Sequence, residues 1–227
     1  MMRTAYREDL NRITDQLVEM TNLAGSALSR ATTALLDADI ALADTVIEAD
    51  QHIDRAREDL DQLAIDLLAR QNPVATDLRT VVTAMRMSAD IERMGDLARH
   101  VAKIARLRYP ESAVPADLRG IIVQMGQVAQ RIVTSAGSVI ASRDLELAAS
   151  LEREDDAMDD LHRELFGQLL ESAGDTQTAV DLTLLGRYFE RFADHAVSLA
   201  RRVGFLVTGE WDTAVDREDE EDHVLNP

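Results

Sequence analysis

The sequence repeats itself after about 100 residues, and this repeat constrains the fold more than any other feature. The segment Asp39-Ile-Ala-Leu-Ala returns as Asp144-Leu-Glu-Leu-Ala at an offset of 105. Further along, Ile91-Glu-Arg-Met-Gly-Asp96 returns as Phe189-Glu-Arg-Phe-Ala-Asp194 at an offset of 98, so the second copy is seven residues shorter between these segments. A chain of this kind uses one structural unit twice.

Each unit has the apolar pattern of long helices. In the second predicted helix the apolar positions alternate spacings of four and three residues, which is a continuous heptad seam of the kind that packs in bundles. Only 4% of the residues are aromatic and only four are proline, which also favours helices over strands. The seam consists of Leu42, Val46, Ala49, Ile53, Ala56, Leu60, Leu63 and Leu67.

The pattern predicts an all-α fold of two tandem, pseudo-symmetric three-helix bundles with six long helices. We expect the first bundle over residues 1–110 and the second over 111–209, divided in the linker between Pro110 and Pro115. Residues 210–227 hold eight acids against Arg217 and are predicted to be a solvated tail. The helices are expected at about 4–36, 39–70, 75–108, from after Pro115 to 142, 144–171 and 175–207.

Composition excludes several classes of function. The formal net charge is −18 and no long Lys/Arg run occurs, which argues against a nucleic-acid partner. Without cysteine there is no disulfide, thiolate nucleophile or iron–sulfur cluster, so any metal must be held by oxygen or imidazole. No run of 18 apolar residues and no signal-peptide segment is present, so we expect a cytoplasmic protein with no direct membrane insertion.

The repeat carries acidic residues at matching positions. Asp50 and Asp54 are four residues apart, as are Glu92 and Asp96, so each pair shares one helix face. Both pairs lie some 20 residues from the turn at Asn72-Pro73, so in an antiparallel hairpin they fall at the same level. We therefore expect four carboxylates to converge here, and another four at the equivalent positions Asp155, Asp159, Glu190 and Asp194.

Converging anions repel and need compensation. Arginine is one candidate, because Arg93 and Arg191 follow the glutamate in both copies and Arg55 follows Asp54. The other candidate is a cation such as Mg²⁺, Mn²⁺, iron or Zn²⁺, for which oxygen-rich sites are suitable. From the residues alone both alternatives remain open.

Histidines add little to these clusters. A ferritin-like di-iron oxidase needs Glu-x-x-His on two helices, and neither helix pair offers it. The repeat counterpart of His100 is Ser198, His52 lies one position off the Asp50 face, and His195 is expected at the surface. His162 and His223 have no counterpart that suggests chemistry, and no phosphate loop or nucleophile elbow is readable.

The segments that carry these acids resemble a known family. Residues Val46–Asp54, Pro73–Arg79 and Asp90–Ala98 resemble the first half of the PhoU family of phosphate-signalling regulators, and Tyr188–Ala196 resembles its second half. The likeness covers about residues 4–208. It implies two three-helix bundles, a cytoplasmic location and frequent dimerisation, hence a homodimer.

The resemblance also implies metal clusters, with iron or zinc favoured over magnesium or manganese. Family members restrain the phosphate-starvation response without being enzymes, linking the ATPase of the phosphate-specific ABC transporter to a sensor histidine kinase. Two alternatives stay open: a metal-dependent hydrolase or oxidase, and a purely structural helical scaffold. Carried over by position, the metal ligands would be Asp50, Asp54, Glu92, Asp96, Asp155, Asp159, Glu190 and Asp194.

Overall fold

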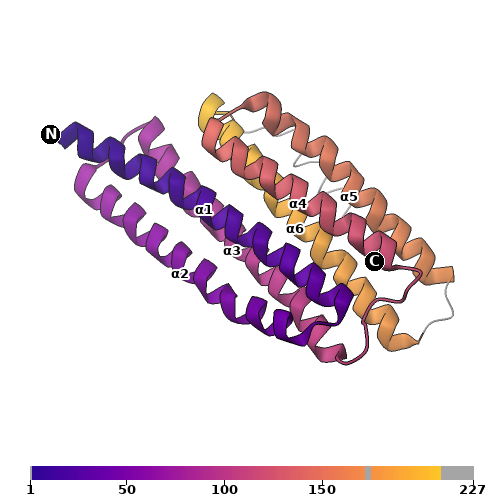
Figure 1. Ribbon diagram of the computed structural model, residues 1–227. Helices are drawn as coiled ribbons and strands as arrows, with labels where there is room; N and C mark the ends of the chain where they lie inside the picture. The colour runs from indigo at the N-terminus through magenta and orange to yellow at the C-terminus, as the bar shows by residue number, and fades with distance from the viewer. Residues whose placement is uncertain (1, 172–174, 211–227) are drawn as a thin grey trace.

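Six helices make up the regular structure of the described chain. The computed structural model describes residues 2–171 and 175–210, and over these residues it contains helices joined by short loops (Figure 1). The predicted all-α fold is confirmed, and the helix ends agree with the prediction to within a few residues. The elements are α1 (Met2–Asp37), α2 (Ile40–Gln71), α3 (Thr76–Arg108), α4 (Arg119–Ser142), α5 (Leu145–Glu171) and α6 (Thr176–Thr208).

Aspartates begin the helices at the predicted breaks. The carboxylate of Asp39 accepts a hydrogen bond from the backbone N–H of Leu42 at 2.9 Å and so caps α2. Asp144 and Asp175 cap α5 and α6 in the same way. Such caps satisfy backbone donors that have no partner inside the helix. The chain therefore turns at these aspartates rather than continuing as one long helix.

The two bundles lie side by side along their length (Figure 1). Helices α1, α2 and α3 pack on one another, as do α4, α5 and α6. Between the bundles α1 packs against α4 and α3 against α6, while α2 and α5 lie on the outer flanks. This arrangement places α3 and α6, the helices that carry the Glu-Arg-x-x-Asp segments, at the centre of the molecule.

The α1–α4 interface shows how closely the bundles approach. A Cβ atom at Gly126 on α4 would lie 3.0 Å from the Thr32 methyl group on α1, and one at Gly137 would lie 3.6 Å from that of Thr21. The partner number falls along α1 as it rises along α4, so the two helices are antiparallel. The repeat offset of 105 relates Thr21 to Gly126 and Thr32 to Gly137. The contacts are therefore reciprocal across the pseudo-symmetry.

One apolar core runs through both bundles. Buried side chains of α1, such as Met20 and Leu28, belong to the same cluster as Phe189 and Phe192 of α6. The predicted boundary falls in the loop 109–118, but the division into domains 1–110 and 111–209 stays a prediction. Of the predicted acidic tail, only Glu210 is described, and residues 211–227 lie outside the described part. Within the described residues, no helix has a stretch long and apolar enough to cross a bilayer.

Candidate metal centres

The first predicted group of acids converges between α2 and α3. We call Asp50, Asp54, Glu92 and Asp96 the first quartet. Asp50 is 5% exposed, and its burial raises the pKa of its carboxyl group. The guanidinium of Arg99 lowers the pKa of Asp50, whereas the charges of Asp54, Asp96 and Glu92 raise it. The other three carboxylates are thus close enough to Asp50 to act on it, as the equal distances from the turn predicted.

Glycine lets the two helices meet at this level. A Cβ at Gly95 would lie 2.8 Å from the δ-methyl group of Ile53 and 3.2 Å from a carboxylate oxygen of Asp50. Gly95 directly precedes Asp96, so the close approach occurs where the acids are. A side chain there would displace the Ile53 and Asp50 side chains of α2 from their present positions.

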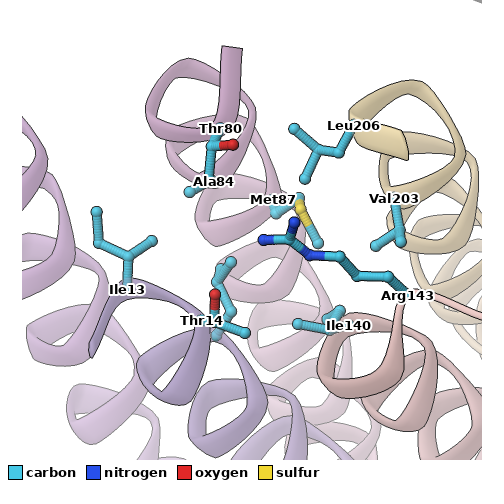
Figure 2. A pocket seen from close by; sticks show the side chains of 10 residues that line it. Ile13, Thr14, Thr80, Ala84, Met87, Ile140, Arg143, Val203 and Leu206 are labelled. Carbon is cyan, nitrogen blue, oxygen red and sulfur yellow. The ribbon is translucent and has the colours of Figure 1, made fainter. Parts of the chain in front are cut away.

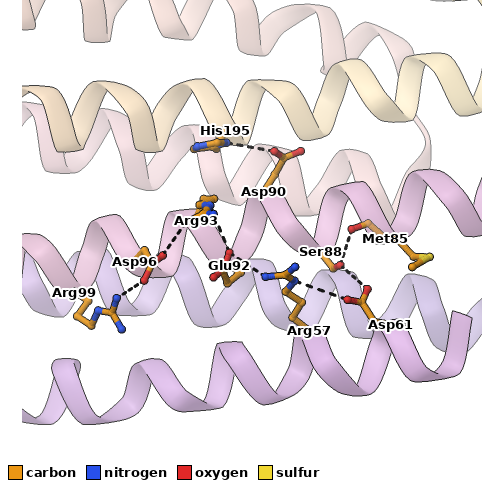
Figure 3. A network of polar contacts seen from close by, with 10 residues as sticks. All are labelled: Arg57, Asp61, Met85, Ser88, Asp90, Glu92, Arg93, Asp96, Arg99 and His195. Carbon is orange, nitrogen blue, oxygen red and sulfur yellow. Dashed lines mark hydrogen bonds and ion pairs between the residues drawn. The ribbon is translucent and has the colours of Figure 1, made fainter. Parts of the chain in front are cut away.

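Three arginines surround the first quartet. Arg99 bridges the helices, with its Nη1 2.5 Å from Asp50 Oδ2 and its Nη2 in contact with Asp96. Arg93 lies 3.4 Å from Asp96 and 3.8 Å from Glu92, and Arg57 lies 3.4 Å from Glu92 (Figure 3). The first quartet is therefore compensated by the protein's own cations.

The second predicted group lies between α5 and α6. We call Asp155, Asp159, Glu190 and Asp194 the second quartet. Burial raises the pKa of Asp155 to about 7, helped by the charges of Asp194, Asp159 and Glu190 and opposed by Arg201. Burial likewise raises the pKa of Glu190 to about 7, with Asp194 and Asp159 adding to it. Two carboxyl groups of this quartet thus hold protons near neutral pH.

The second quartet has oxygens available for a ligand. Asp155 Oδ1 and Glu190 Oε2 are buried and accept no hydrogen bond from the described residues. The other oxygen of Glu190 contacts Arg187, which is itself 45% exposed. Buried carboxylate oxygens without a donor are costly, and a cation would satisfy them. On this observation the donor set fits a hard or borderline metal ion.

The expectation about compensating arginines was correct in part. Arg93 does pair with the first quartet, but Arg55 donates to Gln51 at 3.5 Å and Arg191 is exposed on α6. The sequence reasoning missed Arg57, Arg99 and Arg187. Each of them lies three residues from a quartet carboxylate on the same helix, and that spacing was the signal that could have found them.

The histidines lie in other surroundings. His52 lines an open groove between α1 and α2, and His100 stacks on Tyr188 with ring centroids 5.2 Å apart. The expectation that His195 is a surface residue was wrong: its side chain is 21% exposed and lies 3.4 Å from Asp90, so it joins α6 to α3 (Figure 3).

His162 has surroundings that the sequence did not indicate. Burial and the charge of Arg187 lower the pKa of its imidazole. Its Nε2 is buried without a hydrogen-bond partner among the described residues. The ring lies against Gly186, where a Cβ would come within 3.3 Å of Nε2. Gly186 precedes Glu190 by one helical turn, so the imidazole faces α6 beside the second quartet.

Neither quartet is a preformed metal cage. Across residues 2–171 and 175–210, no three carboxylate or imidazole groups are gathered closely enough to hold an ion as they stand. To hold a cation, the side chains of either quartet would have to turn inward.

A partly open cavity between the two bundles is too small for an organic cofactor. It measures about 20 Å³ and lies where α1, α3, α4 and α6 meet, with Arg143 beside Met87 and Thr14 (Figure 2). That volume suits about one water molecule.

Comparison with known proteins finds the same domain twice along the chain. The family model of the PhoU domain matches residues 17–105 and again 122–203. A relative from Mycobacterium tuberculosis (strain H37Rv), named phosphate-specific transport system accessory protein PhoU homolog 2, is 52% identical over 92% of this chain and 99% of its own length. A PhoU homolog from Rhizobium meliloti is 30% identical over 91% of this chain and 88% of its own.

Solved structures have the same fold. The crystal structure of PhoU from Pseudomonas aeruginosa matches with a TM-score of 0.80 and 28% identity, over 90% of this chain and 100% of that one. The phosphate transport system regulatory protein PhoU from Streptococcus pneumoniae matches with a TM-score of 0.81 over 91% and 98%, at 24% identity. Because the family model covers both repeats and the mycobacterial relative is similar along nearly the whole chain, the protein belongs to the PhoU family.

Proposed function

We propose that this protein is a cytoplasmic negative regulator of the phosphate-starvation response. In this role it acts as a homodimer that links the ATPase subunit of the phosphate-specific ABC transporter to the sensor histidine kinase and so controls phosphate uptake. The observation that carries the proposal is the 52% identity to a phosphate-specific transport system accessory protein along nearly the whole chain. It acts through protein contacts rather than as an enzyme.

Metal ions are the second part of the proposal. The eight quartet carboxylates would hold iron or zinc, with magnesium or manganese as weaker alternatives. The buried, unpartnered oxygens of Asp155 and Glu190 support this, since a cation would replace the protons held there. A bound ion would supply positive charge that cross-links the helices of each hairpin. The protein's own part is to position the carboxylates and keep the hairpins in register.

Deleting the gene tests the regulatory role. We expect expression from a phosphate-starvation promoter to rise at high phosphate in the deletion strain, and to return to the repressed level when the intact gene is restored. Unchanged expression at high phosphate would contradict the proposal.

The partner assignment needs a direct binding measurement. The full chain, immobilised through its N-terminus, is tested against the purified ATPase subunit and the cytoplasmic part of the kinase. We expect saturable binding of both. An unrelated ATPase subunit is the control, and binding of neither partner would remove the adaptor role. Sedimentation of the full chain alone tests the dimer.

Metal content tests the role of the quartets. Protein purified without chelator is analysed for iron and zinc alongside the double variant Asp155→Asn/Glu190→Gln. We expect the double variant to lose metal. The matched control is Asp160→Asn, because Asp160 is 69% exposed and pairs with Arg163 on the same helix. If the intact chain binds no metal, or if the double variant loses none, the metal assignment fails.

A further inference from the structure

The two quartets differ in how the fold compensates them. In the first, Arg99 occupies the space between the carboxylates of α2 and α3 and contacts one acid from each helix. Glu92 Oε2 of the first quartet accepts no hydrogen bond from the described residues, but Arg57 lies 3.4 Å from it.

In the second quartet, buried oxygens of Asp155 and Glu190 accept no hydrogen bond from the described residues either. Arg187 contacts the other oxygen of Glu190 and the charge of Arg201 acts on Asp155, but the residue at the position equivalent to Arg99 is not an arginine. The pseudo-symmetry of the backbone therefore does not extend to the charges.

The repeat offset shows where this difference arises. The counterpart of Arg99 at offset 98 is Val197, which is 2% exposed and belongs to the apolar core. The counterpart of Arg57 at offset 105 is His162. A guanidinium remains charged and offers only donors, whereas an imidazole nitrogen can bind a metal. Two cationic positions around the first quartet are thus replaced by a core residue and a potential ligand around the second.

Arg99 is well placed to compete with a metal. Its two terminal nitrogens contact different carboxylates, Asp50 and Asp96, as a bridging cation would. Asp50 is 5% exposed and Arg99 is 29% exposed, so the pair is shielded from water on the Asp50 side while the arginine retains a path to solvent. A metal at this level must take the oxygens that Arg99 now contacts, and the guanidinium must swing outward.

We propose that Arg99 is a built-in cation that competes with metal for the first quartet, so that the second quartet is loaded first. The inference rests on the proposed metal binding and goes beyond it by ranking the two sites. Without metal, Arg99 holds α2 against α3. When metal is abundant, the ion would displace Arg99, and Asp50 and Asp96 would be among the residues that hold it.

The test is a titration of the full chain with Zn²⁺ in competition with a chelating dye. We expect two classes of site, the tighter one lost in Asp155→Asn/Glu190→Gln. In Arg99→Gln the affinity of the weaker class of sites for Zn²⁺ should rise by about tenfold or more, because a positive charge next to the ion has been removed. Arg99→Lys keeps the charge and is expected to remain close to the unmodified chain.

Arg93→Gln is the matched control. It removes the same charge from the same quartet, but Arg93 is 63% exposed and lies 3.4 Å from its nearest carboxylate. We expect it to tighten the weaker class by only about twofold, since an exposed charge is well screened. If Arg99→Gln changes the weaker class no more than Arg93→Gln does, the competition is overturned. If the intact chain binds no Zn²⁺, the proposed metal binding itself fails. This outcome differs from a chain that binds Zn²⁺ but responds equally to Arg99→Gln and Arg93→Gln, which overturns only the competition.

A second measurement guards against misfolding. Without metal, Arg99→Gln leaves Asp50 buried without its cation, so its melting temperature should fall below that of the unmodified chain. Saturating Zn²⁺ should then raise the melting temperature of Arg99→Gln more than that of the unmodified chain. A smaller rise in the variant would contradict the proposal.

Discussion

At the scale of single residues, Asp155 and Glu190 show how burial among other acids changes a carboxyl group. Their pKa values of about 7 lie above the ordinary values of 3.8 and 4.5. Between about pH 4 and pH 7 these two groups bind more protons in the folded protein than in the unfolded chain. Both groups therefore make the folded state less stable as pH rises through this range. The cost is present in full above about pH 7 and absent below about pH 4.

The double variant Asp155→Asn/Glu190→Gln isolates this effect. In the presence of chelator we expect it to melt at a higher temperature than the unmodified chain at pH 8, because the amides carry no charge to desolvate. The advantage should shrink as pH falls toward 5, since the carboxyl groups are then protonated. Comparing the two proteins at each pH cancels the opposite trend expected from His100 and His162, whose pKa values are lowered. A difference that does not vary with pH would refute the assignment.

Gly209 is a second residue whose role follows from local geometry. It ends α6 with φ of +81°, a left-handed conformation, and a Cβ there would fall on the Arg79 guanidinium. We expect Gly209→Ala to lower the free energy of unfolding by about 1–2 kcal/mol. Gly204→Ala is the control, because that position is helical with open space around it and should gain up to about 1 kcal/mol. Denaturant unfolding followed by circular dichroism measures both, and equal effects would be contrary to this account.

At the scale of elements, α3 carries the features that join the hairpin to the rest of the molecule. Its Gly95 admits α2, its Glu92 and Asp96 belong to the first quartet, and its Asp90 reaches α6 through Arg202 at 2.7 Å.

The heptad pattern of α2 was correct in part. Val46, Ile53, Leu60 and Leu67 are buried as predicted, whereas Leu42, Ala49, Ala56 and Leu63 are only partly buried, and Ala43, Asp50 and Ala64 are buried instead. The pattern did not identify the partners of the polar residues, because a helix can turn several side chains toward the same carboxylate.

The α1–α4 contact predicts unequal effects at two equivalent glycines. The Thr32 side chain is held in place by a 2.8 Å hydrogen bond to the carbonyl of Leu28, so its methyl group cannot easily move from a Cβ at Gly126. We expect Gly126→Ala to be less stable than Gly137→Ala by about 1–3 kcal/mol. Gly137→Ala should gain up to about 1 kcal/mol, because its Cβ meets Thr21 at an ordinary distance.

Rescue is the control for this pair. Adding Thr32→Ser to Gly126→Ala removes the methyl group and keeps the hydroxyl, so the double variant should recover most of the lost stability. The coupling is measured by thermal melting of four proteins: the unmodified chain, Gly126→Ala, Thr32→Ser and the double variant. If Thr32→Ser does not improve Gly126→Ala, the contact is not the cause of the loss.

At the scale of the whole molecule, the two bundles are held by an extended interface. Apolar side chains of α1, α3, α4 and α6 join in one core, and ion pairs join α3 to α6 near the middle of α3 and at its C-terminal end. Arg202 is 2.7 Å from Asp90, and Arg108 is 2.6 Å from Asp181. The loop 109–118 connects the halves but is not what keeps them together.

Cutting that loop tests this view. A protease site introduced at the exposed Glu111 and then cleaved should leave both halves in one peak on size-exclusion chromatography at micromolar concentration. Replacing Asp181 by Ala leaves Arg108 facing the partner bundle without its acid, and should loosen the cleaved complex more than the uncut chain. Separate elution of the two halves without any substitution would show that the bundles are independent.

The sequence by itself determined the six helices, the repeat and the level at which the eight acids lie. These follow from spacing along the chain, because helix periodicity and distance from a turn are properties of each hairpin alone. The tertiary structure decided that Arg99 lies between Asp50 and Asp96, that His195 joins the bundles and that Thr32 packs on Gly126. Such contacts depend on how neighbouring helices are rotated and which rotamers fit between them, and spacing within one helix carries no information about either.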